Sequence, residues 1–285
     1  MAGIRLEWAQ FGDFDSFDVI RSDAPMDINA LPSPIVTNLP TMYYVDTTVV
    51  EGATYYYRVV AWRDAASKVS GEIQAKALAG DEYWDKVVAL LHFDGDLVDE
   101  TGLNDWSGSG FTYSSGIFGQ SIQIASGNGV ITSEKQDFIF DREFTIEAFI
   151  DGTLTNTHKV IMSSNANTWI NGAAYLLLVH PSRKLEMGTY TQGHMINGNF
   201  IFPERVFFFT LSATMENYYI FCDGVLVETI PRNGASVDFS RYGTRLGKNW
   251  DGLHFTKTLD ELRITKGVAR YTENFTPPAE PFPSF

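Results

Sequence analysis

The chain has 285 residues, and 35 acidic against 21 basic residues give it a formal net charge of −14 at pH 7. This charge argues against a nucleic-acid-binding surface and against an anchor on an anionic membrane, because both need clustered positive charge. Hydrophobic residues make up 44% of the chain, which is too many for a disordered protein. The length favours two domains.

The sequence predicts no membrane insertion and no disulfide. It contains no apolar run long enough to span a bilayer, and its first residues lack the basic start and apolar stretch of a signal peptide. Cys222 is the single cysteine, so it has no intramolecular partner and is expected to be a small core hydrophobe.

Residues 1–80 have the pattern of a small β-sandwich. Val, Ile, Tyr and Phe recur in short stretches between turn residues, which predicts strands at 4–8, 17–20, 55–62 and 72–77. The proline-rich segment 31–40 is expected to be a loop or an edge connection, since proline cannot donate to a central ladder.

Two neighbouring motifs in this part, Asp46–Val49 and Gly52–Val59, resemble a fibronectin type III domain, and the resemblance covers residues 4–78. In that family a tyrosine of the second motif packs in the core and the glycine makes the preceding turn. The resemblance implies a domain that serves as a spacer, a docking surface or a subunit contact.

Residues 81–285 predict one larger all-β domain. A buried strand is expected at 87–93, another strand within 116–124, and a cleanly alternating one at 144–150. An Asp223-Gly224 turn predicts a hairpin between two further strands. The proline-rich segment 275–283 is expected to be extended and to lie along this domain.

Motifs at 91–95, 118–121, 144–149, 223–227 and 259–271 follow one another in an order that resembles the concanavalin A-like jelly roll in its laminin G-like form. One departure is that Glu204–Phe209 stands where that family usually has a Trp-His pair before the hairpin. The closing segment also resembles the ends of such domains in bacteriophage tail and other virion proteins. The resemblance implies a virion protein that is made in the host cytoplasm.

No catalytic pattern is found, so the chain is predicted not to be an enzyme. Glucanases of this fold class use a Glu-x-Asp-x-Glu strand, whereas here Thr145 stands between Glu143 and Glu147. Along an extended strand these two carboxylates lie about 13 Å apart. They alternate with the apolar residues, so they are expected on a solvated strand face.

Calcium is the candidate cofactor, because jelly rolls of this type often hold Ca²⁺ with aspartates at a rim. Asp94 and Asp260 are the candidate ligands, since the first and last strands of this fold are neighbours. The alternative is that Asp94 caps a turn and Asp260 accepts backbone hydrogen bonds.

Glycan binding needs aromatic rings together with amides and carboxylates, and predicted loops carry these residue types. The candidate contacts are Trp106, Trp169, Tyr190, His194, Asn249, Trp250 and Asp251. The alternative for each tryptophan is that it fills the core, and the sequence does not show whether the loops converge.

The favoured hypothesis is a non-catalytic phage tail or fibre protein whose jelly roll binds carbohydrate on the host surface. The alternative is a structural tail-tip or capsid-decoration protein that contacts other virion proteins as a homo-oligomer. Consecutive phenylalanines at 207–209 bear on this choice, because side chains alternate along a strand. At least one of them needs a second apolar surface, supplied either by its own domain or by a partner.

Overall fold

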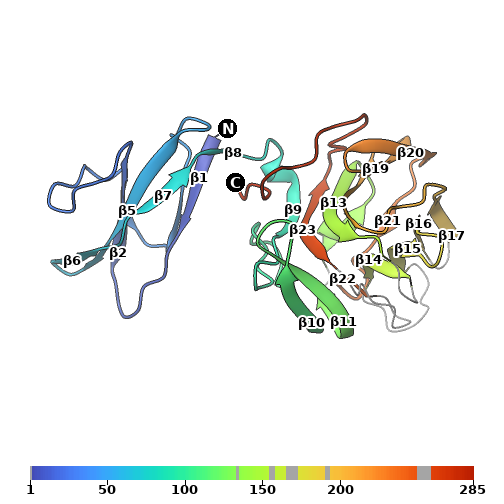
Figure 1. Cartoon of the computed structure of the whole chain (residues 1–285). Helices are drawn as coiled ribbons and strands as arrows, with labels where there is room; N and C mark the ends of the chain where they lie inside the picture. The colour runs from blue at the N-terminus through green and yellow to red at the C-terminus, as the bar shows by residue number, and fades with distance from the viewer. Residues whose placement is uncertain (1, 133–134, 154–157, 165–172, 190–192, 249–257) are drawn as a thin grey trace. The chain divides into compact units, whose positions relative to one another are not determined.

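The computed structural model describes residues 2–132, 135–153, 158–164, 173–189, 193–248 and 258–285 (Figure 1). It divides into two compact units: unit 1 comprises Met1–Trp84 with Pro283–Phe285, and unit 2 comprises Asp85–Phe282. The division lies beyond the expected boundary at residue 80, and the last residues of the chain belong to unit 1. In the described part, regular structure is almost entirely β, so the predicted all-β class is confirmed. No helix there is long and apolar enough to cross a membrane.

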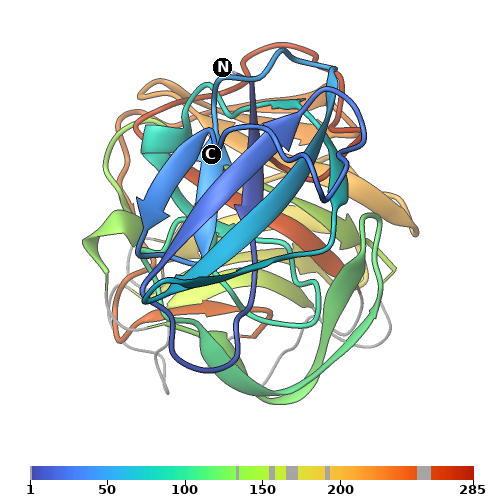
Figure 2. The same ribbon diagram turned by 90° about the vertical axis from the view of Figure 1, so that its left-hand side faces the viewer.

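Unit 1 contains two sheets that share one core, and its strands are seen in Figure 2. The first sheet has the order β4-β1-β8, and the second has the order β3-β2-β5-β6 with β7 also on β5. The proline-rich segment contains β3, which pairs at the edge of the second sheet with β2. The strands are β1 (Ala2–Glu7), β2 (Ser16–Ser22), β3 (Val36–Leu39), β4 (Tyr43–Asp46), β5 (Thr54–Arg63), β6 (Ala66–Val69), β7 (Ile73–Lys76) and β8 (Leu78–Ala79).

A buried carboxylate, that of Asp46, lies next to the core of unit 1. The Tyr57 hydroxyl donates to Asp46 at 2.9 Å, and the Arg21 guanidinium donates to the same carboxylate at 2.8 Å. Burial alone raises the pKa of Asp46, but hydrogen bonds from Thr48, Tyr57 and Arg21 outweigh it and hold the pKa below its ordinary value. Asp46 is therefore a buried charge with a full set of partners.

In unit 2 the described strands form one long sheet with the order β17-β16-β15-β14-β22-β11-β23-β13-β18-β19-β20, with β10 on β11 and β9 on β23. A short pair, β12 (Ile139–Phe140) and β21 (Val237–Asp238), lies apart from it. The bounds are β9 (Val87–Leu91), β10 (Ser107–Ser115), β11 (Gln120–Ile131), β13 (Phe144–Asp151), β14 (Lys159–Ser164), β15 (Ala174–Val179), β16 (Lys184–Thr189), β17 (Gly193–Asn197), β18 (Val206–Ala213), β19 (Asn217–Cys222), β20 (Val225–Pro231), β22 (Thr244–Leu246) and β23 (Leu259–Lys266).

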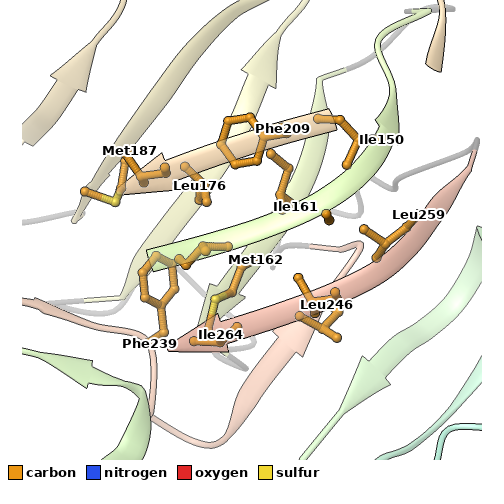
Figure 3. Close-up of a cluster of buried hydrophobic side chains, with 14 of the residues drawn as sticks. Ile150, Ile161, Met162, Leu176, Met187, Phe209, Phe239, Leu246, Leu259 and Ile264 are labelled. Carbon is orange, nitrogen blue, oxygen red and sulfur yellow. The ribbon is translucent and has the colours of Figure 1, made fainter. Parts of the chain in front are cut away.

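The long sheet folds back on itself around one core. Strand β11 pairs with β23 at Ile122 and with β22 at Val130, so it belongs to both layers. Buried side chains from β14, β15 and β16 meet those from β13, β18 and β23, as Figure 3 shows for Ile161, Leu176, Phe209 and their neighbours. Each such side chain stabilises the fold by about 1.5–3 kcal/mol through burial of apolar surface.

The phenylalanines of β18 are divided between two surfaces within unit 2. Phe207 and Phe209 belong to the core, and Phe208 points to the opposite side. There its ring lies 4.9 Å from Phe149 and about 6 Å from the rings of Phe275 and Phe282 in the C-terminal segment. The outward surface of β13, β18, β19 and β23 is called the covered face below. Of the two alternatives, the second apolar surface is therefore supplied by the same domain.

The expectation that Glu147 lies on a solvated strand face is wrong. It faces away from the core as the alternation predicts, but its side chain is fully buried on the covered face. Arg263 donates to its carboxylate at 2.9 Å and 2.8 Å, and the Arg263 guanidinium lies 3.7 Å from the centre of the Phe282 ring. Glu147 is buried because the C-terminal segment covers this side of the sheet. Strand alternation alone predicts that this side is exposed to solvent.

Candidate functional site

The outward surface of β15, β16 and β17, called the open face below, presents polar and aromatic side chains. Leu176 and Leu178 of β15 point into the core, so Tyr175 lies on the other side of the strand. The register pairs Tyr175 with Gly188 on β16 and Gly188 with His194 on β17. These three residues therefore form one row across the strands.

Tyr175 extends along the sheet and over β16. Its hydroxyl shares a 3.0 Å hydrogen bond with Nδ1 of His194, which lies two strands away. A Cβ atom placed on Gly188 would meet that hydroxyl at 3.0 Å and the carbonyl oxygen of Gly193 at 2.5 Å. Glycine at position 188 thus leaves room both for the carbonyl group of Gly193 and for the tyrosine hydroxyl.

Glu186 completes the cluster on the open face. Its Oε2 lies 3.7 Å from Nδ1 of His194, and the two side chains are 26% and 51% exposed. Burial raises the pKa of the Tyr175 hydroxyl, and the negative charge of Glu186 raises it further. Tyr175 therefore keeps its proton at neutral pH. The face offers hydrogen-bond donors and acceptors beside an aromatic ring, a combination suited to a ligand rich in hydroxyl groups.

Among the predicted glycan contacts, His194 is the one that the structure places on this face. Trp169, Tyr190, Asn249, Trp250 and Asp251 lie outside the described residues.

Trp106 is in the core and not on a binding surface, so the prediction of a glycan contact there is corrected. Its side chain is 8% exposed and packs edge-to-face against Phe138, with ring centres 5.8 Å apart. The indole N–H donates to Asp99 at 3.1 Å, and that carboxylate also accepts from Asn104. A buried acceptor beside the ring explains how a polar-edged side chain is accommodated in the core.

The two predicted calcium ligands both accept hydrogen bonds from backbone amides of one turn. This agrees with the alternative in which Asp94 caps a turn and Asp260 accepts backbone hydrogen bonds. Asp94 accepts a hydrogen bond from the amide of Gln120 at 2.5 Å, and Asp260 accepts from the amides of Ile117 and Phe118 at 2.6 Å and 3.3 Å. Strands β9 and β23 are neighbours, as expected. Burial raises the pKa of Asp260 to about 7, and its Oδ1 has no hydrogen-bond partner among the residues that the structure describes.

A metal needs more ligands than these two carboxylates supply. The described residues contain no group of three or more His, Cys, Asp or Glu side chains that could hold a metal ion. Calcium therefore stays a prediction.

Cys222 behaves as expected for a core residue. It is 8% exposed and belongs to the hydrophobic core of unit 2. Burial raises the pKa of its thiol to about 11, so the reactive thiolate is scarce at neutral pH.

Sequence reasoning missed Tyr175, Glu186 and Gly188. One signal was present, because a glycine inside a strand often marks a place where another group approaches the backbone closely. The side chain that approaches Gly188 is that of Tyr175 on the neighbouring strand. A glycine in the sequence therefore indicates where a close approach occurs but does not identify the residue that approaches.

Comparisons with known proteins show a similarity of fold to solved structures. No family model and no curated protein sequence matches the chain. Among solved structures, domain 4 of AbnA, a GH43 extracellular arabinanase from Geobacillus stearothermophilus in complex with arabinotriose, matches with a TM-score of 0.51 and 21% identity. The match covers 64% of this chain and 93% of that domain. At this identity the likeness shows the fold alone.

Two further matches have lower scores. The botulinum neurotoxin serotype D binding domain matches with a TM-score of 0.48 and 12% identity over 65% of this chain and 49% of that one. Trypanosoma rangeli sialidase matches with a TM-score of 0.48 and 9% identity over 75% of this chain and 40% of that one. The matched parts are therefore less than half of those proteins.

Proposed function

We propose that unit 2 is a non-catalytic carbohydrate-binding domain and that the open face contacts the sugar. The observation that carries this proposal is the Tyr175 side chain, which the hydrogen bond to His194 holds along the sheet over Gly188. A ring fixed in this way provides a platform for the apolar C–H surface of a sugar. His194 and Glu186 beside it supply a donor and an acceptor for hydroxyl groups.

The likeness to the arabinanase domain supports the proposal at the level of the fold. That domain was solved with arabinotriose bound, so a fold of this kind accommodates an oligosaccharide. Fold does not imply function, and the argument for this chain therefore depends on the residues of the open face.

The carboxylates of the described residues support binding without catalysis. Glycoside hydrolysis in its usual form needs two carboxyl groups that flank the bond, about 5–10 Å apart. Strands β15, β16 and β17 contribute one carboxylate, Glu186. Glu147 is held in a buried ion pair and Asp260 holds a turn, so both have structural roles.

A narrower proposal concerns the biological setting. The resemblance of the closing segment to phage virion proteins supports a place on a tail or fibre, with unit 1 as an attachment or spacer and carbohydrate on the host surface as the ligand. The alternative is a structural virion protein that forms oligomers. Calcium bound near Asp94 and Asp260 is a further proposal, and it is independent of the open face.

A glycan array tests carbohydrate binding with the full chain, the Tyr175→Ala variant and a Tyr43→Ala control. Tyr43 is 53% exposed on unit 1, so its removal deletes a tyrosine away from the proposed site. We expect saturable binding by the wild type and the control, and a loss of at least about tenfold in Tyr175→Ala, or ~1.4 kcal/mol. Absence of binding to every glycan, or equal binding by Tyr175→Ala, contradicts the proposal.

Two additions to the same experiment separate the narrower proposals. Binding that disappears in EDTA supports calcium, and binding that persists in EDTA excludes a metal requirement while leaving the open face intact. A chain that binds no glycan and forms defined oligomers in solution supports the structural alternative.

A further inference from the structure

Unit 1 has a hollow of about 390 Å³ that is lined by acidic and aromatic side chains. It lies where β2 begins and β5 ends, and these two strands pair side by side (Figure 1). Three aspartates, Asp15, Asp18 and Asp64, line it together with Trp62 and with neutral polar side chains of β2 and β3. All of these residues belong to unit 1.

Asp18 is the buried member of this group, since it is 8% exposed. Its Oδ1 accepts a hydrogen bond from the amide of Asn38 at 3.0 Å, and its Oδ2 accepts one from the indole N–H of Trp62 at 2.8 Å. Both donors are neutral. Within the described part of the chain, no lysine, arginine or histidine forms an ion pair with this carboxylate.

Asp46 in the same unit shows the usual way of burying a carboxylate. It is fully buried, and the Arg21 guanidinium pairs with it at 2.8 Å. A charge is costly to bury unless an opposite charge accompanies it. Asp18 is buried without such a cation, and it borders a hollow that a ligand can enter. The hollow is therefore the place where a cation would complete the charge balance of Asp18.

The other two aspartates add negative charge at the mouth of the hollow, where both are exposed. Asp15 accepts the amide of Asp64 at 2.5 Å through Oδ2, which leaves its Oδ1 for a ligand. The nearby Arg63 lies 3.6 Å from Asp13. The side chains that line the hollow, all within the described residues, include no basic one. Its charge is thus complementary to a cation.

A metal ion does not suit the hollow. The described residues contain no set of three acidic, histidine or cysteine side chains that could hold a metal ion. A larger, organic cation can instead reach carboxylates that lie too far apart for one metal. Among such groups, the planar guanidinium of arginine matches best, because it forms forked hydrogen bonds to carboxylates and also packs against an indole ring.

We propose that this hollow binds the side chain of an arginine on a partner protein. The guanidinium hydrogen-bonds to the carboxylates of Asp15 and Asp64 and balances the charge of the buried Asp18. Trp62, whose indole N–H is held by Asp18, supplies the aromatic surface. Unit 1 is then a protein-docking module, and this inference is independent of carbohydrate binding by unit 2.

NMR titration of the isotope-labelled full-length chain tests the inference. The probe is a blocked peptide with one arginine between two glycines. The controls replace the arginine by citrulline, which has the same shape without the charge, or by lysine. We expect saturable shift changes at the indole N–H of Trp62 with a dissociation constant of about 1–10 mM, weaker binding by the lysine peptide and none by the citrulline peptide.

A double variant, Asp15→Asn with Asp64→Asn, should weaken binding of the arginine peptide by about fivefold or more. Asparagine keeps the acceptor at position 15, and at position 64 it tolerates the left-handed backbone, which has φ of 51°. The matched control is Asp23→Asn, since Asp23 is exposed just beyond the other end of β2.

Three results overturn the inference. They are absence of saturable changes at Trp62 in the millimolar range, equal binding of the citrulline or lysine peptide, and equal binding by the double variant and the wild type. None of them affects carbohydrate binding, which the glycan array measures separately.

Discussion

The two outward faces of unit 2 use aromatic residues in opposite ways. On the covered face, Phe208 packs against Phe149 and also against Phe275 and Phe282 of the C-terminal segment. On the open face, Tyr175 is half-buried beside an exposed His194. Both are faces of the same sheet, and they differ in chemistry: aromatic rings pack on one another on the covered face, whereas hydrogen-bonding side chains lie beside Tyr175 on the open face. Packed rings contribute to stability, whereas donors and acceptors beside a ring suit a hydroxyl-rich ligand.

Removing a covered ring is the strongest test of this comparison. Phe208→Ala should lower the free energy of unfolding by about 3–5 kcal/mol, because it leaves a cavity under the C-terminal segment. The measurement is urea denaturation followed by circular dichroism. The matched control is Phe11→Ala, since Phe11 is 96% exposed and its loss should change stability little. Equal effects of the two substitutions contradict the description of the covered face.

The buried carboxyl group of Asp260 on β23 should make stability depend on pH. The pKa of Asp260 is raised to about 7, so between pH 4 and 7 the folded protein binds a proton that the unfolded chain releases. Its stabilisation is present at low pH and is lost as the pH rises through the folded pKa. From pH 5 to 8 this group should lower the free energy of unfolding by about 2–3 kcal/mol.

The Asp260→Asn variant isolates this contribution, because the amide oxygen can still accept from Ile117 while the titration is removed. Unfolding is measured in EDTA at each pH, and the difference between wild type and variant is plotted. A difference that does not change with pH means that Asp260 has an ordinary pKa. Asp46→Asn in unit 1 is the contrasting case, since partners lower the pKa of Asp46 and the slope should have the opposite sign.

A smaller effect is expected from adding one methyl group to the open face. Gly188→Ala places a carbon 2.5 Å from the carbonyl oxygen of Gly193 and 3.0 Å from the Tyr175 hydroxyl, so the backbone of β17 must shift together with the tyrosine and glycan affinity should fall by about tenfold. Gly71→Ala is the control, because a Cβ there meets nothing within 4 Å. Titration calorimetry with the best-binding glycan gives both affinities. An unchanged affinity in Gly188→Ala means that the position of Tyr175 does not matter for binding.

The smallest expected effect separates the ring from its hydroxyl. Tyr175→Phe keeps the aromatic surface and removes the hydrogen bond to His194, which is worth about 0.5–1.5 kcal/mol. That bond fixes the ring within the protein and is not itself a contact with the glycan, so affinity should fall by less than about tenfold and by less than in Tyr175→Ala. If the two substitutions have the same effect, the hydroxyl and not the ring is the main contact.

Local signals in the sequence predicted much of the fold of unit 2. The strands at 87–93 and 144–150 and the hairpin at Asp223-Gly224 stand out because of dense apolar residues, clean alternation and a strong turn pair. Strand β10 has no such signal, since its sequence SGSGFTYSS is rich in glycine and serine, and its pairing with β11 defines it.

The proposed binding surface was harder to predict because its groups meet across strands. Tyr175 gains its position from Gly188 and His194, and sequence alone does not give the register that joins them. Trp106 and Glu147 were misjudged because tertiary packing buries them. The ring of Trp106 packs against Phe138 while the nearby Asp99 accepts its indole N–H, and Arg263 under Phe282 of the C-terminal segment pairs with Glu147.

The most direct test of the account is to map where the glycan binds. Backbone amide NMR spectra of the isotope-labelled chain are recorded during titration with the best-binding oligosaccharide from the array. The account predicts that the largest shift changes fall at Tyr175, Gly188 and His194, while Phe208 and Phe275 on the covered face do not move. Largest changes on the covered face, or in unit 1, with the open face unaffected, contradict it.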